Sequence, residues 1–170
     1  MKEIRQIFER IAEHHEIPMR LGSRCEASVF YRVEDLTIDE LEICAQFLSD
    51  RVIKVCQPTL PEMLIKLPGG YTELTEELAK QLASANESLR IVTWDEIERS
   101  NGKGSIAKGA SVVLVNDVIT TARSCLEAHT RITVMGASVL CWVALIDRTF
   151  GPGPVPVITA YTGAPVRLLE

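Results

Sequence analysis

The sequence predicts an α/β fold in which a central, mostly parallel sheet is flanked by helices. Short β-branched runs alternate with segments whose apolar residues recur at helical spacing, and this alternation is typical of parallel sheets. Residues 138–147 (SVLCWVALID) form a nearly continuous apolar run, as expected of a strand that is buried on both faces. A second apolar run, over 111–116, ends in an Asn-Asp pair. In such sheets, sites lie at the carboxyl ends of the strands.

Size and composition limit the classes of protein to consider. The 170 residues are 46% hydrophobic and 24% charged, which predicts one ordered domain over 1–170 with a small N-terminal annex over about 1–36. The net charge of −5 gives no general attraction to nucleic acid or to an anionic membrane, so we expect neither as a partner. No apolar run approaches the roughly 18 residues that a membrane-spanning helix requires.

Cysteine usage predicts a reduced environment. The five cysteines are widely spaced, odd in number and without a Cys-x-x-Cys pair, so we expect free thiols that act as small apolar residues. The first ten residues are amphipathic and contain acidic as well as basic residues, unlike a secretory signal. Together these features predict a cytoplasmic protein.

The annex is predicted to contain a helix and a strand. Apolar residues at helical spacing predict a helix over 2–15. His14 and His15 would close it, because cations suit the negative end of a helix dipole. Residues 28–33 (SVFYRV) are β-rich and predict a short strand.

A capping box begins the next predicted helix. Thr37 followed by Glu40 is the Thr-x-x-Glu pattern in which each residue binds the other's backbone, so we expect a helix over 37–54. The apolar triplet 63–65 is then expected to form a short buried strand.

The remainder alternates between helices and strands. Helical spacing predicts helices over 72–84 and 122–133. Turns rich in glycine and proline are expected at 67–71 and 151–154, and the polar, glycine-containing stretch 95–110 is expected to be a mobile loop. The remaining predicted strands are 89–94, 111–116, 138–147 and 155–161.

Several common site motifs are missing from the sequence. There is no Gly-x-x-x-x-Gly-Lys-Ser/Thr phosphate loop, no Gly-x-Gly-x-x-Gly fingerprint after a strand and no Gly-x-Ser-x-Gly elbow. Histidine is scarce, and no Cys/His cluster has the spacing of a zinc site.

The most informative segment is 112–124 (VVLVNDVITTARS). A buried strand delivers the carboxylate of Asp117 to its carboxyl end, and a hydroxyl-rich turn then leads into a helix. Backbone N–H groups and the helix dipole favour a phosphate at such a helix N-terminus. This segment is therefore expected to hold both a ribose diol and a phosphate.

The same segment resembles the phosphoribosyl-pyrophosphate (PRPP) motif of the type I phosphoribosyltransferases, and the pattern is most similar to orotate phosphoribosyltransferase. That motif is an apolar strand, two acidic residues, an apolar pair, Thr-Thr, two small residues and Ser or Thr. Three further segments resemble this family in the right order: 21–31 (LGSRCEASVFY), 67–71 (LPGGY) and 147–148 (Asp-Arg). The resemblance implies the family's fold, with the annex acting as a hood over the base.

The resemblance also implies roles for individual residues. Asp117 would bind the ribose hydroxyls of PRPP and stabilise positive charge that develops on the ribose, with Asn116 beside it, and Lys103 would be a second catalytic residue that reaches the pyrophosphate. The 5′-phosphate would be wrapped by the N–H and O–H donors of Thr120, Thr121, Ala122, Arg123 and Ser124. The pyrophosphate would face Lys66, Gly69 and Gly70, and the base would meet Arg24, Tyr31 and Arg148.

The implied cofactor is Mg²⁺, bridging pyrophosphate and ribose oxygens with few protein ligands. The implied reaction is displacement of pyrophosphate from PRPP by a nitrogen of a nucleobase, in a homodimer. The alternative is an inactive protein on the same fold that binds PRPP or a nucleoside monophosphate as a regulator. A third, weaker reading is an oligomeric scaffold without a ligand.

The segment departs from the family pattern at two places. Asn116 stands where the family has its first acidic residue, and Ala122-Arg123 stands where it has two small residues. Arg123 can clamp a phosphate, crowd the turn or be a solvated residue of the first helical turn. The 95–110 stretch also has no histidine, which the mobile loop of the orotate enzymes carries. Tyr31 is read either as part of the base site or as ordinary core.

Overall fold

The computed structural model describes residues 2–21, 25–100, 104–149 and 153–169. Its core is a five-stranded sheet in the order β4-β3-β5-β6-β7, and every neighbouring pair is parallel. The predicted α/β fold with a central parallel sheet is confirmed. The strands are β3 (Met63–Lys66), β4 (Arg90–Thr93), β5 (Ser111–Ile119), β6 (Ser138–Asp147) and β7 (Val157–Thr162).

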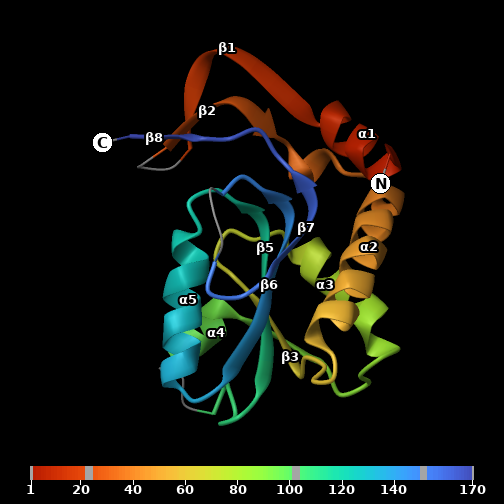
Figure 1. Ribbon diagram of the computed structural model, residues 1–170, viewed down its shortest axis with the longest axis vertical. Coiled ribbons are helices and arrows are strands. Elements are labelled where there is room, and N and C mark those ends of the chain that lie inside the picture. The colour runs from red at the N-terminus through yellow and green to blue at the C-terminus, as the bar shows by residue number, and fades with distance from the viewer. Residues whose placement is uncertain (1, 22–24, 101–103, 150–152, 170) are drawn as a thin grey trace.

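Two helical layers cover this sheet (Figure 1). Helices α2 (Ile38–Cys56) and α3 (Thr72–Ala83) pack on one face, and α4 (Trp94–Arg99) and α5 (Arg123–Val134) lie on the other. The strand over 138–147 is buried along almost its whole length, as its apolar run predicts. Trp142, in the middle of this strand, is 1% exposed and belongs to the core.

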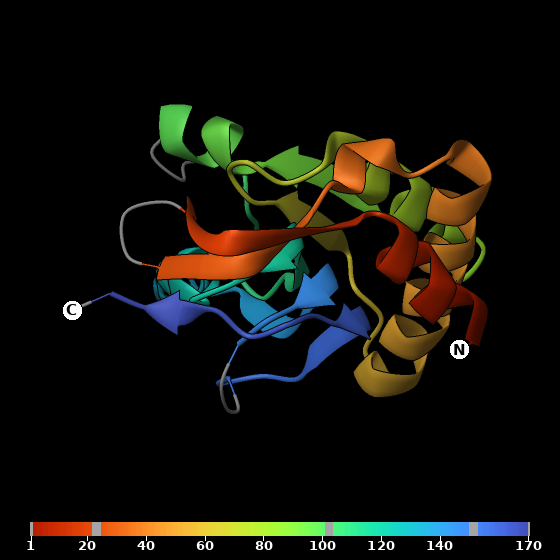
Figure 2. The same cartoon turned by 90° about the horizontal axis from the view of Figure 1, so that it is seen from above.

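A second, antiparallel sheet forms a hood over the carboxyl ends of the core strands. It contains β1 (Ala12–Leu21), β2 (Cys25–Tyr31) and the short β8 (Arg167–Leu168), in the order β1-β2-β8. Figure 2, which looks down on the hood, shows these strands lying across the core. The annex was expected from N-terminal residues alone, but its sheet also takes a strand from the C-terminal end of the chain.

The predicted helix over 2–15 is too long. Helix α1 covers Lys2–Arg10, and residues 12–21 form strand β1 instead. The buried helical positions stop with Phe8 and the adjoining Ile11, and the following residues pair with β2, where Glu13 lies opposite Phe30. His14 and His15 are therefore strand residues and do not close a helix. Tertiary pairing decides the conformation of this polar stretch.

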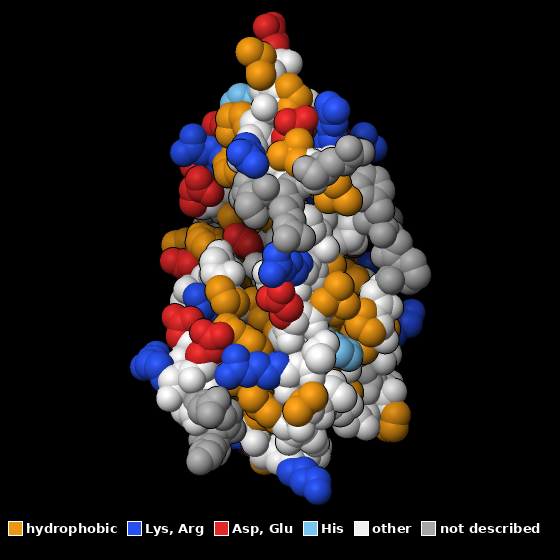
Figure 3. Space-filling model, turned by 90° about the vertical axis from the view of Figure 1, so that its left-hand side faces the viewer, with side chains coloured by type: hydrophobic (Ala, Val, Ile, Leu, Met, Phe, Trp, Pro, Cys, Tyr) orange, Lys and Arg blue, Asp and Glu red, His pale blue; other side chains and the backbone are white. Residues whose placement is uncertain are grey.

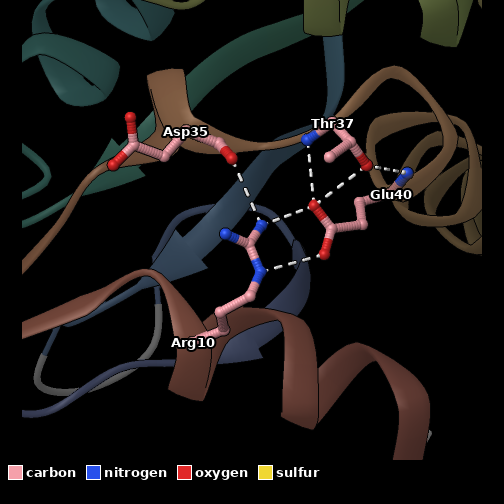
Figure 4. Close-up of polar contacts among 4 residues, drawn as sticks. All are labelled: Arg10, Asp35, Thr37 and Glu40. Atoms are coloured by element: carbon pink, nitrogen blue, oxygen red, sulfur yellow. Dashed lines mark hydrogen bonds and ion pairs between the residues drawn. The ribbon is translucent and has the colours of Figure 1, made fainter.

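Figure 4 shows how α1 is joined to the start of α2. Arg10 donates from Nε to Glu40 Oε1 at 3.1 Å and from Nη2 to the carbonyl of Asp35 at 3.2 Å. Glu40 also accepts from the backbone N–H of Thr37 at 2.9 Å, while its own N–H donates to Thr37 Oγ1 at 3.3 Å. The predicted capping box is present, and Arg10 ties α1 to it.

The expectation of a loop throughout 95–110 is wrong at its beginning. Thr93 and Glu96 form a second capping box and begin α4. Trp94 is buried, its Nε1 donates to Glu98 at 3.1 Å, and the guanidinium of Arg131 from α5 lies 5.4 Å from its ring centroid. The Thr-x-x-Glu pattern at 93–96 is visible in the sequence and is the signal that identifies this helix.

On the side of the molecule that carries α5, Lys and Arg side chains are interspersed with Asp and Glu (Figure 3). Hydrophobic side chains also reach the surface there. Within α5, Leu126 and Val134 are exposed. Among the helices in the described ranges, none is long and apolar enough to cross a bilayer.

Candidate active site

Strand β5 places the central carboxylate. It runs to Ile119, three residues beyond the predicted end, so Asp117 lies inside the strand rather than after it. Asp117 Oδ1 accepts the backbone N–H of Val118 at 2.6 Å, and Asn116 Oδ1 accepts that of Asp117 at 3.0 Å. Both side chains are thus oriented by the local backbone.

Burial raises the pKa of the Asp117 carboxyl above its ordinary value, because desolvation disfavours the charged form. The N–H of Val118 opposes this shift, as does the positive charge of Lys66, whereas the negative charge of Glu34 adds to it. The pKa of Asp117 therefore depends on groups from three segments: the backbone of β5, Lys66 at the end of β3, and Glu34.

The turn after β5 forms a small cup. Residues 116 and 118–125 line a cavity of about 80 Å³ at the N-terminus of α5. Ala122 is the N-cap and has a φ of 57°, in the left-handed region that favours glycine. The first backbone N–H groups of a helix have no partner within the helix, so this cup presents donors to an anion. Thr120, Thr121 and Ser124 add hydroxyls to its wall.

Arg123 lies at the surface beside this cup. Its Nε forms an ion pair with Glu127, one turn further along α5, at 2.7 Å, and both side chains are more than half exposed. Of the three alternatives for this residue, the structure favours the solvated residue of the first helical turn.

The 66–70 segment lies against β5. Lys66 ends β3 and is paired in register with Val115, and its Nζ donates to the carbonyl of Gly70 at 3.3 Å. A Cβ on Gly70 would lie 3.1 Å from the carbonyl oxygen of Leu67 and 3.4 Å from Asn116 Oδ1. Glycine at this position therefore avoids crowding against the Leu67 carbonyl where the loop approaches Asn116. Gly69 has a φ of 76° and faces open space.

A cavity of about 240 Å³ separates the hood from the core. Residues from five segments line it, and they include both Tyr31 of β2 and Asp117 of β5. The full lining is Leu21, Phe30, Tyr31, Val33 and Glu34 from the hood, with Asp117, Val118, Thr120 and Arg148 from the core.

Arg148 is the buried cation of this cavity. It is 3% exposed, and its Nε donates to the carbonyl of Ala164 at 2.6 Å. Its guanidinium carbon lies 5.5 Å from the ring centroid of Tyr31, and its Nη2 has no hydrogen-bond partner among the described residues. Burial lowers the pKa of Arg148, yet a guanidinium remains charged at any physiological pH. The cavity is therefore lined by a positively charged side chain whose Nη2 group can still donate hydrogen bonds.

The neighbouring Asp147 organises the turn that follows β6. Its Oδ1 accepts from the N–H of Thr149 at 2.8 Å and from the Thr149 hydroxyl at 2.7 Å. The N–H of Arg148 donates to the carbonyl of Ile119 at 2.8 Å, so this turn is tied to the end of β5.

The structure brings together most of the predicted site residues. Gly70 approaches Asn116, which lines the cup together with the 120–124 turn, and Lys66 ends the strand that pairs with β5. The cavity that Asp117 lines also contains Tyr31 and Arg148. Tyr31 is both core and cavity wall, since it is 6% exposed. Arg24 and Lys103 lie outside the described residues. Sequence reasoning missed Glu34 and the backbone of Ala164.

The residues fit a magnesium ion whose ligands come mainly from a bound phosphate compound. Asp117 offers a carboxylate oxygen, the ligand type that Mg²⁺ prefers, beside the threonine hydroxyls of the 120–124 turn. Within the described ranges, no group of three or more His, Cys, Asp or Glu side chains is placed to hold a metal.

Solved structures identify the class of fold. Orotate phosphoribosyltransferase from Aeropyrum pernix superposes with a TM-score of 0.69 at 21% identity, covering 94% of this chain and 93% of that one. Adenine phosphoribosyltransferase from Leishmania tarentolae gives a TM-score of 0.67 at 17% identity, covering 94% and 87%. The chain therefore has the type I phosphoribosyltransferase fold.

The sequence resemblance is narrower than the fold resemblance. Orotate phosphoribosyltransferase 2 of Mesorhizobium japonicum is 28% identical over 118 residues, which are 64% of this chain and 60% of that protein. No family model matches the chain. The predicted resemblance to the phosphoribosyltransferases is confirmed, and the curated relatives are orotate phosphoribosyltransferases. The matched region spans about 60% of the length of the Mesorhizobium protein.

Proposed function

We propose that this protein is a phosphoribosyltransferase of the orotate type, which binds PRPP with Mg²⁺ and transfers its phosphoribosyl group to a nucleobase. The observation that supports the proposal is that three features of the site lie together. The Asp117 carboxylate, the cup at the start of α5 and the Lys66–Gly70 loop adjoin one another at the carboxyl ends of two neighbouring strands. This combination suits a ribose that is flanked by two phosphate groups.

In this proposal each element holds one part of PRPP. The 120–124 turn binds the 5′-phosphate through N–H and O–H donors, and Asp117 accepts hydrogen bonds from the ribose hydroxyls. Lys66, Gly69 and Gly70 face the pyrophosphate, and Lys103 would reach it from the 101–103 segment. Mg²⁺ would supply charge neutralisation between pyrophosphate and ribose oxygens. As pyrophosphate leaves, the Asp117 carboxylate stabilises the positive charge that develops at the ribose.

The cavity under the hood is the proposed base site. Tyr31 forms its wall and Arg148 supplies unpaired donors, and Arg24 is proposed to lie in the same annex. A cation with free N–H groups favours a base that carries an acidic substituent or adjacent carbonyl oxygens. The cavity volume of about 240 Å³ suits a single-ring base better than a whole nucleoside.

One observation supports a second candidate, a regulatory protein that binds PRPP or a nucleoside monophosphate without turnover. Asn116 is neutral, and its Oδ1 already accepts the N–H of Asp117. Binding through the phosphate cup does not require a charge at position 116, whereas stabilisation of a cationic ribose benefits from one.

Titration calorimetry with PRPP and Mg²⁺, followed by a panel of bases with a pyrophosphate-release assay, separates the candidates. The enzyme reading expects micromolar PRPP binding and pyrophosphate release with at least one base. Binding without release for any base would favour the regulator. If neither PRPP nor any nucleoside monophosphate binds at millimolar concentration, both readings fail.

We further propose a cytoplasmic homodimer, as the resemblance implies, built from one domain over 1–170. Sedimentation velocity on the purified protein tests the dimer: a mass near 18.8 kDa at micromolar concentration would contradict it.

A further inference from the structure

The cavity under the hood contains a second carboxylate. Glu34 lies in the short 3-10 helix η1 (Val33–Asp35), which connects the hood to α2. It lines the same cavity as Asp117, so the hood and β5 each contribute one acidic side chain. Among the residues that line this cavity, these two are the acidic ones and Arg148 is the basic one.

The local contacts of Glu34 leave its carboxylate accessible. Arg32 Nε lies 3.5 Å from Glu34 Oε1 and 3.3 Å from Asp35 Oδ2, so the two adjacent carboxylates share one cation. The side chain of Glu34 is 56% exposed and that of Asp35 is 52% exposed. The two residues differ in position: Glu34 lines the cavity and Asp35 does not.

Glu34 and Asp117 reach the same cavity from two different segments of the chain, η1 and β5. At position 116 the strand offers only a neutral amide, whose oxygen is used by the N–H of Asp117. The negative charge on this side of the site therefore comes from positions 34 and 117.

We propose that Glu34 is the second acidic residue of the active site and that, with Asp117, it supplies the negative charge facing the ribose and the magnesium ion of PRPP. This inference rests on the proposed function, since it assigns a residue to the same site. A carboxylate in this cavity attracts a divalent cation and favours positive charge at the ribose.

Two variants and a matched control, Asp35→Asn, test the inference. Glu34→Gln removes the charge at nearly constant shape. Asp35→Asn removes the neighbouring charge, which pairs with the same Arg32 atom outside the cavity. The double variant Glu34→Gln/Asn116→Asp moves a carboxylate to the strand position next to Asp117.

The measurements are the PRPP dissociation constant by calorimetry at several Mg²⁺ concentrations, and the Asp117 pKa by carboxyl-carbon NMR without ligand. We expect Glu34→Gln to weaken Mg²⁺-dependent PRPP binding about tenfold, the loss typical of one charge-assisted contact, and to lower the Asp117 pKa. Asp35→Asn should stay within about twofold of the wild type, and the double variant should recover to within about threefold.

The outcomes separate the two proposals. If the wild type binds PRPP but Glu34→Gln behaves like Asp35→Asn, the role of Glu34 is overturned while the proposed function stands. If the double variant Glu34→Gln/Asn116→Asp does not recover PRPP binding, the role of Glu34 is also overturned, because the loss in Glu34→Gln would then not be due to its charge. If the wild type binds no PRPP, the proposed function itself fails, and the Asp117 pKa in Glu34→Gln still reports whether the two carboxylates face each other.

Discussion

Arg148 and Tyr31 are both hydrogen-bonded to the backbone of a single residue, Ala164. The N–H of Ala164 donates to the Tyr31 hydroxyl at 2.9 Å, and its carbonyl accepts from Arg148 Nε at 2.6 Å. The guanidinium lies over the tyrosine ring, 5.5 Å from its centroid. A wall of the proposed base site is thus assembled from the hood, the end of β6 and the C-terminal segment.

The first prediction concerns Arg148. Arg148→Met should raise the KM for the base at least about tenfold and leave PRPP affinity within about twofold, because the side chain lines the base cavity and not the phosphate cup. The melting temperature should change little, since Met fills the space and removes a buried charge that lacks a carboxylate partner among the described residues. Steady-state kinetics and thermal melting measure the two effects. Arg5→Met, on the exposed face of α1, is the control and should affect neither.

The second prediction links function and stability at Asp117. Asp117→Asn should weaken PRPP binding by about tenfold to a hundredfold, because it removes charge-assisted hydrogen bonds to the ribose. The raised pKa means that the folded state holds this proton more tightly than the unfolded state. The wild type therefore loses stability as the pH rises from the ordinary carboxyl value through the raised one.

The same reasoning predicts the stability of the variant. Asp117→Asn should melt at a higher temperature than the wild type at pH 7. The difference should vanish below about pH 4, where the Asp117 carboxyl of the wild type becomes neutral in both the folded and the unfolded state. Thermal melts across this pH range measure it. A variant that binds PRPP like the wild type would count against the ribose role, and one that is less stable at pH 7 would count against the burial argument.

The third prediction concerns the left-handed residue at the start of α5. Ala122→Gly should stabilise the protein by about 1 kcal/mol, because glycine adopts a φ of 57° without the clash that an alanine Cβ makes. Urea unfolding measures the change. The opposite sign is expected for Ala79→Gly inside α3, which should lose about 1 kcal/mol.

The fourth prediction concerns Gly163, which precedes the residue that binds Tyr31 and Arg148. A Cβ there would lie 2.7 Å from Ile146 Cγ2 and 3.1 Å from both Arg148 Cγ and Tyr31 Cε2. Gly163→Ala should therefore cost about 1–3 kcal/mol of stability by overpacking and disturb base binding more than PRPP binding. Gly104→Ala meets no atom within 4 Å and should cost only the strain of its positive φ, about 1 kcal/mol. Equal base affinity in Gly163→Ala and the wild type would contradict this account.

Much of the core could be predicted from local pattern. Apolar runs identify β5 and β6, and the Thr37/Glu40 capping box identifies the start of α2, because these signals are local to the chain. The phosphate cup follows from the same logic, since a strand, a hydroxyl-rich turn and a helix are consecutive in the sequence.

The hood was harder to predict, because its structure depends on distant pairing. The polar residues of β1 become a strand only through their ladder with β2, and their sequence pattern does not separate them from the preceding helix. Glu34 belongs to no sequence motif, and its proposed role can be inferred only from the cavity that it lines together with Asp117. Ala164 acts entirely through its backbone, for which no side chain provides a signal.

The contact between Tyr31 and Ala164 also bears on the order of events during synthesis. These residues are 133 positions apart, and β8 closes the hood sheet from the same C-terminal segment. Strands β1 and β2 are therefore synthesised well before the segment that supplies their last partners. The nascent chain would complete its ligand-binding cavity only after the strands of the parallel sheet beneath it have been made.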